Sequence, residues 1–238
     1  KTWPKPKIGI LSIGNNLRSA FDCGKPGEPD IVSPVLGAML GNLYKYQITQ
    51  LGVCDYDLNE IKSKLLDSNC DVLIVTGNPG LNVTMLVDHL EARILFGLVD
   101  VTPELPAAFC SIKHNDIRIP IFMLPKEPEL ACMASLVLVL PFLEQSARQY
   151  LQPNLSGLEL IGLRIKAKVV MIEDDNYESH LEQTEILRAH VLCEPNNTGH
   201  YPVAIQAKNQ ANSLLNLKNF NCIILKPKEE IIQVDSIV

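Results

Sequence analysis

The chain has 238 residues, and 27 acidic against 21 basic side chains give it a formal charge of −6 at pH 7. Hydrophobic residues make up 47% and charged residues 20%, which is enough for one large or two modest folded domains and too apolar for a disordered chain. This acidic balance argues against nucleic acid or an anionic membrane as the main partner, because both bind basic surfaces.

The longest apolar run covers residues 130–143 and contains Ser135 and Pro141, so it predicts a buried helix. A membrane span needs about 20 apolar residues, and we expect none here. The seven cysteines form no C-x-x-C pair, and most have apolar neighbours. Reduced, buried thiols are therefore expected, which is typical of a cytoplasmic protein.

The first 150 residues alternate predicted strands with predicted helices. The apolar runs 7–13, 53–56 and 71–76 predict strands, and 34–51 predicts a helix that closes at Gly52. Asp57 and Glu60 form a capping-box variant that opens a second helix. Further on, a helix is expected near 85–92, strands at 93–99, 107–112 and 118–123, and a long helix from Pro128 to about residue 150.

Such alternation is typical of the α/β class, with a mostly parallel sheet covered on both faces. We expect this three-layer domain to occupy residues 1–155. From residue 163 to 238 the pattern changes to short strands between turns, which predicts a small all-β C-terminal domain. Its strands are expected at 163–172, 185–193, 200–206, 222–225 and 231–234, with a polar turn at 173–176 and a short helix at 211–217.

Ligands bind open α/β sheets where strand ends meet helix starts, here the loops 14–16, 76–80 and 124–128. These loops lack the spacing of a phosphate-binding or dinucleotide-binding motif, so ordinary turns are the favoured interpretation of their sequence. The chain has no G-x-S-x-G motif and no cysteine beside a recognisable histidine partner, and its five histidines lack metal spacing. The residues themselves thus predict a pocket without catalytic or metal-ligating groups.

Five segments resemble the C-terminal half of the MoeA and gephyrin E-domain family, the molybdenum insertases of molybdenum cofactor synthesis. Residues 8–17 resemble V-x-V-L-S-T-G-D-E-L, residues 72–80 resemble V-V-I-T-S-G-G-V-S, residues 99–106 resemble V-A-M-R-P-G-K-P, residues 120–128 resemble P-V-F-G-L-P-G-N-P and residues 220–227 resemble A-N-G-L-I-V-L-P. Their order and spacing agree over about 220 residues. The resemblance implies a MogA-like α/β domain followed by a small barrel-like β domain.

The departures from the family pattern fall on its chemical positions. The Asp-Glu of the first motif is Asn15-Asn16, and the two acids that follow the second are Val83 and Met85. Glu104-Leu105 and Lys126-Glu127 stand where the family has Gly-Lys and Gly-Asn, and an Asp-Ser-Asn segment is shortened near residues 32–33. Ligands for a cation and donors for a phosphate-bearing pterin are thus replaced.

The resemblance therefore implies a vestigial pocket with no catalytic residue, cofactor or metal. Its expected residues are Ser12, Asn15, Asn16, Thr76, Gly77, Asn78, Asn82, Pro103, Glu104, Pro125, Lys126 and Glu127. We expect a catalytically inactive scaffold, by analogy with gephyrin, that forms a homodimer and binds another protein, plausibly a transcription factor in developmental timing. The alternatives are a molybdenum insertase, or an enzyme that binds another anion through Lys126 and Asn78.

Overall fold

A computed structural model describes residues 5–24, 26–99, 101–102, 104–151, 165–172, 182–205 and 220–238. The chain divides into two compact units. The first, here called the α/β unit, comprises Lys1–Val99 and Pro106–Ile161, and the second, the β unit, comprises Asp100–Leu105 and Gly162–Val238. Residues 100–105, expected from the sequence in the α/β domain, join the β unit because β7 (Val101–Thr102) pairs with a strand of that unit.

The α/β unit contains a six-stranded sheet in the order β4-β1-β5-β9-β8-β6. The strands are β1 (Lys7–Ile13), β4 (Gln47–Cys54), β5 (Val72–Gly77), β6 (Arg93–Val99), β8 (Leu105–His114) and β9 (Ile117–Pro125). The pairs β1–β4, β1–β5 and β5–β9 are parallel, whereas β8 and β9 form an antiparallel hairpin turned by Asn115 and Asp116, both at positive φ. The predicted α/β class with a mostly parallel sheet is confirmed.

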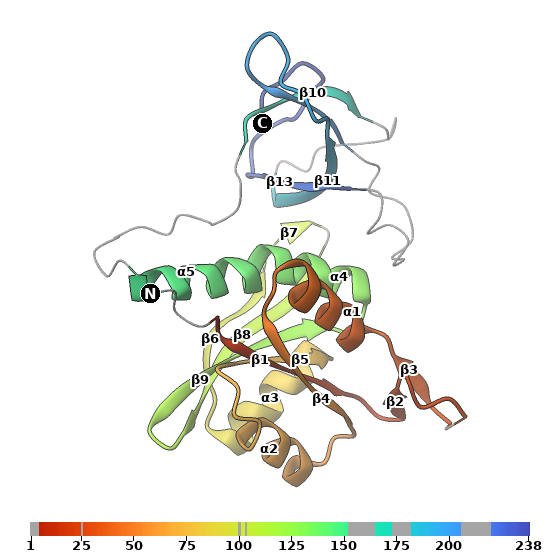
Figure 1. The fold of residues 1–238 in the computed structure, drawn as a ribbon, viewed down its shortest axis with the longest axis vertical. Coiled ribbons are helices and arrows are strands. Elements are labelled where there is room, and N and C mark those ends of the chain that lie inside the picture. The colour runs from red at the N-terminus through yellow and green to blue at the C-terminus, as the bar shows by residue number, and fades with distance from the viewer. Residues whose placement is uncertain are drawn as a thin grey trace. The chain divides into compact units, whose positions relative to one another are not determined.

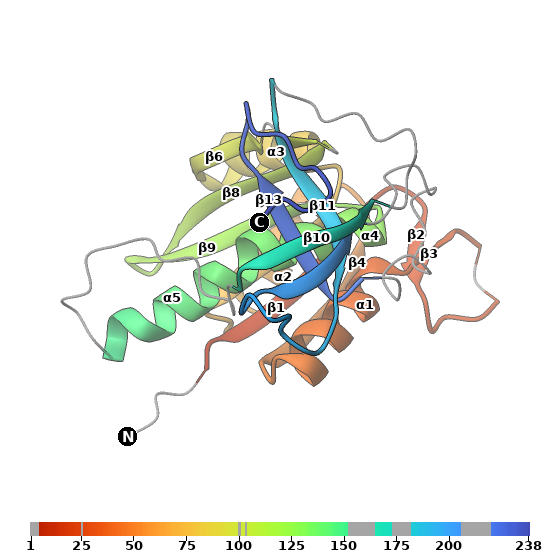
Figure 2. The same ribbon diagram turned by 90° about the horizontal axis from the view of Figure 1, so that it is seen from above.

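Helices cover both faces of this sheet (Figures 1 and 2). On one face lie α2 (Leu58–Leu66) and α3 (Pro79–Leu90). On the other face lies α1 (Val32–Ala38), which continues into the π-helical turn η1 (Met39–Leu43). The same face carries a long helix that consists of α4 (Pro128–Ala134), η2 (Ser135–Val139) and α5 (Leu140–Leu151). The predicted start of α2 is confirmed, because the Asp57 carboxylate accepts hydrogen bonds from the N–H groups of Asn59 and Glu60. The two short strands β2 (Leu17–Ser19) and β3 (Glu28–Asp30) pair outside the main sheet.

The helix predicted for residues 34–51 is wrong in its second half, because residues 47–54 form strand β4. Lys45 has a positive φ, which ends the helix before the strand. Gly52, expected as the residue after a helix, instead adopts φ +85° beside a shift in the register of β4 against β1. Glycine thus marks a β-bulge at this position.

Both faces of the central strands are buried. Ile8 and Ile10 on one face of β1 and Leu11 and Ile13 on the other are at most 1% exposed. The second pair packs with side chains from β5, β8, β9, α2 and α3 in one apolar cluster. Burial on two faces explains why these strands read as uninterrupted apolar runs in the sequence.

The β unit has a five-stranded sheet in the order β10-β12-β11-β13, with β7 also paired to β11. Its strands besides β7 are β10 (Ala167–Ile172), β11 (Thr184–Val191), β12 (Tyr201–Ile205) and β13 (Cys222–Lys226). Seven buried side chains form its apolar core: Ala167, Val169, Leu187, Ala189, Val203, Ile205 and Ile232. The helix predicted at 211–217 and the turn at 173–176 lie outside the described residues.

The strand predicted at 231–234 is wrong. The chain instead makes turns there and returns to β10 through a bridge between Ile237 and Lys168. Asp235 has a φ of +72°, and its N–H donates to Val169 O. A left-handed residue of this kind interrupts an extended strand.

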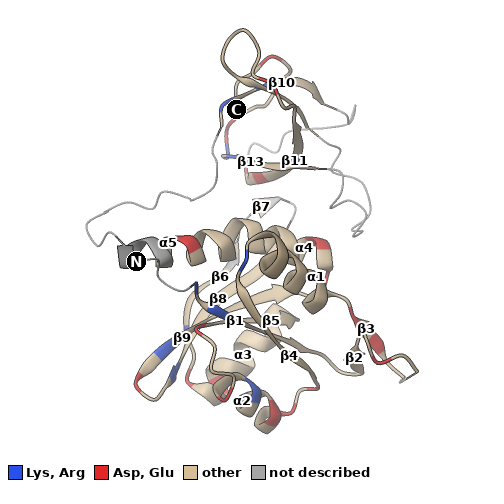
Figure 3. Ribbon diagram, viewed as in Figure 1, with Lys and Arg blue, Asp and Glu red and all other residues tan. Residues whose placement is uncertain are grey.

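One described helix, Pro128–Ser146, is long and apolar enough to cross a membrane by length and composition. Half of its apolar window is buried, and residues such as Ala131, Met133 and Leu143 are in the core. Between Glu129 in its first turn and Glu144 on α5, the helix carries no charged residue (Figure 3). This burial is that of a core helix, as its sequence predicted.

Candidate functional site

The carboxyl ends of three neighbouring strands open into one cavity of the α/β unit. Strands β1, β5 and β9 lie side by side and run parallel, so the loops after Ile13, Gly77 and Pro125 meet at one edge of the sheet. The cavity has a volume of about 680 Å³. It is completed by residues 28–32, Tyr56 and the start of α3. We call it the strand-end pocket.

The strand-end pocket brings together most of the residues proposed from sequence. Those that line it are Asn15, Thr76, Gly77, Asn78, Pro125, Lys126 and Glu127. Ser12 lies behind Thr76, where the two buried hydroxyl groups share a hydrogen bond of 2.7 Å. These positions come from all three strand ends, so the parallel topology is what assembles them.

The other proposed residues are placed differently. Asn16 lines an open hollow beside residues 55–60, and its N–H donates to the Asp55 carboxylate. Glu104 is exposed and belongs to the β unit, in the excursion of residues 100–105 whose strand β7 pairs with β11. It is not among the residues that line the pocket. Pro103 lies outside the described residues.

Gly77, which lines the pocket, lies at a close approach between the ends of β1 and β5. Its φ is +139°, and a Cβ atom there would lie 2.3 Å from the carbonyl oxygen of Ile13 and 3.2 Å from the amide nitrogen of Asn82. Any other residue would therefore force strands β1 and β5 apart at their ends. The close approach keeps the two loops next to each other.

Asn82 lies beneath this loop in the first turns of α3 and is fully buried. Within the described part of the chain, neither its side-chain oxygen nor its side-chain nitrogen has a hydrogen-bond partner. Burying an amide in this way costs free energy. Asn82 is not among the residues that line the strand-end pocket, although its amide nitrogen lies close to Gly77, which does line it.

The sequence analysis missed Asp30. The residue is 4% exposed, and its carboxylate accepts hydrogen bonds from the N–H groups of Val32 and Ser33 and from the Ser33 hydroxyl. Asp30 thus fixes the start of α1 and also lines the pocket. An acid three residues before Ser33 and an apolar helical run was the available signal.

The two helix starts at the pocket offer few donors to an anion. The side chain of Asn78 accepts the N–H of Leu81, and Pro79 has no N–H to give. Pro128 likewise begins α4 without a donor, directly after the carboxylate of Glu127. Backbone N–H groups at helix starts are what normally bind phosphate, and here several of them are missing or already used.

The charges around the pocket are mainly negative. Of the described residues that line it, Glu28, Asp30 and Glu127 are acidic and Lys126 is basic. Tyr56 also lines it, and burial raises the pKa of its phenol, which keeps it a neutral hydrogen-bond donor. In addition, five lining residues are prolines: Pro29, Pro79, Pro106, Pro125 and Pro128. The wall is therefore acidic, apolar and poor in N–H groups.

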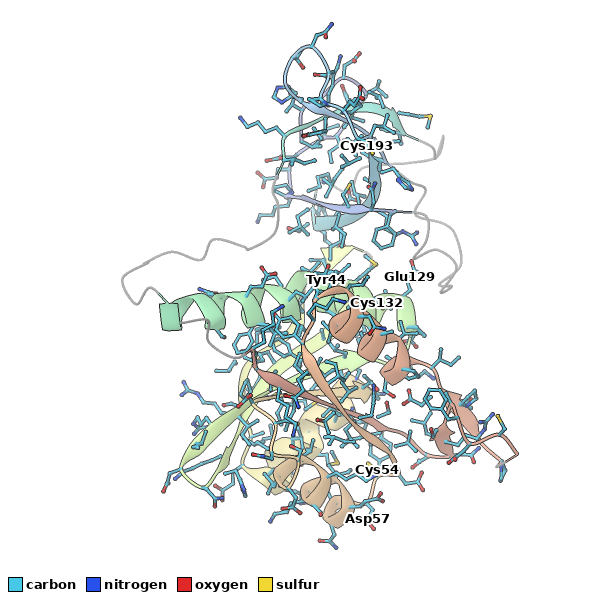
Figure 4. All side chains as sticks on the ribbon, viewed as in Figure 1. Tyr44, Cys54, Asp57, Glu129, Cys132 and Cys193 are labelled. Carbon is cyan, nitrogen blue, oxygen red and sulfur yellow. The ribbon has the colours of Figure 1, made fainter. Side chains whose placement is uncertain are left out.

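Thiol and metal chemistry receive no support from the described residues. Burial raises the pKa of Cys54 and Cys132 to about 11, so both stay protonated and weakly nucleophilic. Glu129, one turn before Cys132 on α4, adds to the latter shift (Figure 4). No group of three or more His, Cys, Asp or Glu side chains that could hold a metal ion occurs in the described ranges.

No family model matches the sequence. Among solved structures, the molybdopterin biosynthesis protein MoeA from Pyrococcus horikosii matches with a TM-score of 0.66 and 18% identity, over 94% of this chain and 50% of that one. The tungsten cofactor synthesizing protein MoaB from Pyrococcus furiosus (TM-score 0.40, 14% identity) covers 63% of this chain and 94% of its own. A molybdenum cofactor biosynthesis protein B (TM-score 0.44, 13% identity) covers 61% and 95%.

The MoeA comparison shows that the chain has a MoeA-like fold, as expected from its sequence motifs. The chain spans about half the length of that protein. At 18% identity the likeness concerns the fold alone, so function depends on the residues of the site.

Proposed function

We propose that this chain is a catalytically inactive protein of MoeA-like fold that serves as a scaffold for other proteins. The observation that carries the proposal is the chemistry of the strand-end pocket, which has three carboxylates, one lysine and a wall rich in prolines. A phosphate-bearing pterin would meet net negative charge there. Each misplaced charge costs about 1–4 kcal/mol at surface-like dielectric.

The same features suit a protein ligand. Prolines and the side chains of Leu17, Ile31 and Leu81 give apolar contact, and Glu28 and Glu127 can pair with a basic residue. The proposed occupant is an exposed peptide segment that combines an apolar side chain with a lysine or arginine. A transcription factor that acts in developmental timing is our proposed source of that segment, with the scaffold acting as a cytoplasmic homodimer that makes no direct contact with nucleic acid.

Enzymatic inactivity is tested with adenylylated molybdopterin, molybdate and Mg²⁺, with product measured by chromatography. A molybdenum insertase of demonstrated activity serves as the positive control. We expect no product above the buffer level from this chain. Turnover above buffer would overturn the proposal and support the alternative, a molybdenum insertase or a related pterin-binding enzyme.

Partner binding is tested by charge reversal. Glu28→Lys and Glu127→Lys are each expected to abolish recovery of a protein partner that wild type captures from cytosol. The matched control is Glu60→Lys, because Glu60 lies on α2 and pairs with Lys64 outside the strand-end pocket. Equal capture by wild type and both pocket variants would show that the pocket does not hold the partner.

The alternative of an anion-binding enzyme rests on Lys126 and Asn78, which both line the pocket. It requires inorganic phosphate to bind, and to bind less tightly to a Lys126→Ala variant. Calorimetric titration distinguishes the two functions, because the scaffold proposal expects no heat of phosphate binding in either protein.

A further inference from the structure

A second cavity of the α/β unit lies between α2 and α3, the two helices that cover one face of the six-stranded sheet (Figure 1). It has a volume of about 210 Å³ and shares no lining residue with the strand-end pocket. We call it the interhelical slot. Side chains about one helical turn apart form its two walls, with Leu58, Ile61 and Lys62 on α2 and Met85 and His89 on α3.

The interhelical slot is apolar at its base. Ile61 and Leu86 are at most 1% exposed, and Met85 and Leu90 are partly buried against the same apolar cluster. Leu58 also lines the slot and is 38% exposed. A hydrocarbon group in the slot would therefore cover apolar surface that water now contacts, which is favourable.

The rim of the slot carries two exposed polar side chains, one from each helix. Lys62 and His89 form no hydrogen bond or ion pair with another residue in the part of the chain that the structure describes. A lysine ammonium has three donors and no acceptor, and a histidine ring donates through at least one nitrogen in either protonation state. The rim is therefore suited to a group that accepts hydrogen bonds and carries negative charge.

The acidic side chains of the two helices do not line the slot. Glu60 pairs with Lys64 at 2.9 Å, and Asp57 caps the start of α2. Asp88 directly precedes His89, but successive residues of a helix are rotated by about 100°, which turns Asp88 toward another side of α3. An anion in the slot would thus meet Lys62 with no carboxylate in the wall.

The volume of the slot limits the size of its occupant. At about 30 Å³ for each water molecule in the liquid, the slot has room for about seven waters. An apolar cavity of about 150 Å³ in another protein holds benzene. The slot is also smaller than the cavities that take drug-sized ligands, which measure about 300–1,000 Å³. A ligand of about eight non-hydrogen atoms, most of them carbon, therefore fits.

We infer that the interhelical slot binds a small monocarboxylate with an apolar tail of about five or six carbon atoms. The tail packs on Ile61, Met85 and Leu86, and the carboxylate accepts hydrogen bonds from Lys62 and His89. A hydrogen bond from an ammonium to a carboxylate is stronger than one between neutral groups, so Lys62 contributes most of the selectivity for an acid. This site is separate from the strand-end pocket and does not depend on the function proposed for that pocket.

The test is an NMR titration of the full 238-residue chain with hexanoate. The chain has five methionines, so isotope labelling of their methyl groups gives five signals, and Met85→Leu identifies that of Met85. We expect hexanoate to shift the Met85 signal with a Kd of about 1 mM or below. Hexanol has the same tail without the charge and is expected to bind about fivefold more weakly or less tightly still.

Two variants test the rim. Lys62→Met removes the ammonium but keeps an apolar stem, so it should weaken hexanoate binding about tenfold and leave hexanol binding unchanged. His89→Leu should weaken hexanoate binding about fivefold. The matched control is Lys113→Met, which alters an exposed lysine of the β8–β9 hairpin outside the slot and should change neither affinity. Circular dichroism checks that each variant is folded.

The same chemistry could come from the carboxyl end of a peptide whose last residue is apolar. The peptide Gly-Gly-Leu with a free carboxylate separates the two sources, and we expect it to bind more weakly than hexanoate because its amide groups would lack partners in an apolar slot. Tighter binding of this peptide overturns the inference of a small ligand. So does a Met85 signal that stays unmoved at about 20 times the expected Kd. Equal affinity for hexanol and hexanoate, or unchanged hexanoate binding in either rim variant, also overturns it.

Discussion

Among the described residues, a buried polar pair joins neighbouring strands in each unit, and the two pairs differ in charge. In the α/β unit, Ser12 and Thr76 are register partners on β1 and β5 and share a hydrogen bond. In the β unit, Glu185 and Lys226 are register partners on β11 and β13, with an Nζ–Oε2 distance of 3.3 Å and both side chains fully buried. A neutral pair costs little to bury, whereas an ion pair costs several kcal/mol before it gains anything.

This contrast suggests different reasons for polar burial. The hydroxyl pair reaches the strand-end pocket through Thr76, and the same unit also buries the polar residues Asp30 and Asn82. The ion pair lies beside a much smaller apolar core. A one-residue slip of β13 against β11 would separate its charges in a buried place, so we infer that the pair specifies the register of this unit.

The largest expected effect comes from breaking the ion pair on one side. Glu185→Ala removes the carboxylate opposite a buried ammonium, and we expect the free energy of unfolding to fall by about 3–5 kcal/mol. Urea unfolding followed by circular dichroism measures this loss. The control is the double variant Glu185→Leu, Lys226→Met, which removes both charges and is expected to restore most of the stability. A loss below about 1 kcal/mol in the single variant would contradict the contrast between the units.

The next effect concerns a thiol in each unit. Burial raises the pKa of Cys132 in the α/β unit and of Cys222 in the β unit to about 11. Below pH 8 each thiol is protonated in both the folded and the unfolded chain. The stabilisation gained by burying the neutral thiol is therefore fully present. Between about pH 8.5 and 11 the unfolded chain loses the proton and the folded chain retains it, so stability falls by about 2–3 kcal/mol per thiol.

The measurement is urea unfolding of wild type, Cys132→Ala and Cys222→Ala at several alkaline pH values. Each variant is expected to show a shallower loss of stability with rising pH than wild type, whatever its stability at pH 7. An unchanged slope in Cys132→Ala would mean that its thiol is not protected from ionisation.

A smaller loss of stability is expected when the neutral pair of Ser12 and Thr76 is broken. Thr76→Val keeps the shape of the side chain but leaves the buried Ser12 hydroxyl without its partner, which should cost about 1–3 kcal/mol. Adding Ser12→Ala should recover part of this cost. The coupling energy from the double-mutant cycle, measured by urea unfolding, should be smaller than that of Glu185 and Lys226. A larger coupling energy for Ser12 and Thr76 than for Glu185 and Lys226 would contradict the contrast between the two units.

The smallest loss of stability is expected at an exposed residue that belongs to neither buried pair. Asp57→Ala removes the side-chain cap of α2, with bonds of 2.9 and 3.1 Å to two N–H groups, and should cost about 1 kcal/mol. Thermal or urea unfolding gives this value. Asp57→Asn is the matched control and should retain most of the stability, since an amide oxygen also caps a helix.

Much of the fold could be predicted because its signals are local. The cap at Asp57, the proline at the start of the long helix and the apolar runs of β1 and β5 each depend on neighbouring residues alone. The predicted secondary structure was wrong where pairing with a strand distant in the sequence determines the conformation. Residues 47–51 have a helical pattern, yet pairing with β1 makes them a strand, and the 231–234 run yields to the bridge with β10.

The candidate site was predictable to the extent that strand ends were recognised. Parallel order brings the residues after β1, β5 and β9 together, and Asn15, Asn78 and Lys126 accordingly line one pocket. Glu104 was assigned there by position in a motif, but pairing of the neighbouring strand β7 draws its segment into the other unit. Asp30 escaped notice because its role depends on the geometry of a turn, which its sequence signals only weakly.

The short excursion of residues 100–105 has a consequence for how this architecture could be inherited. The chain passes between units three times, after Val99, after Leu105 and after Ile161. Four strands of the β unit come from the C-terminal part of the chain, and the fifth, β7, is encoded in the middle of the α/β unit. Genetic recombination that replaced everything after residue 161 would leave β7 behind to pair with a foreign β11. The two units are therefore bound to evolve as one piece, although each has its own core.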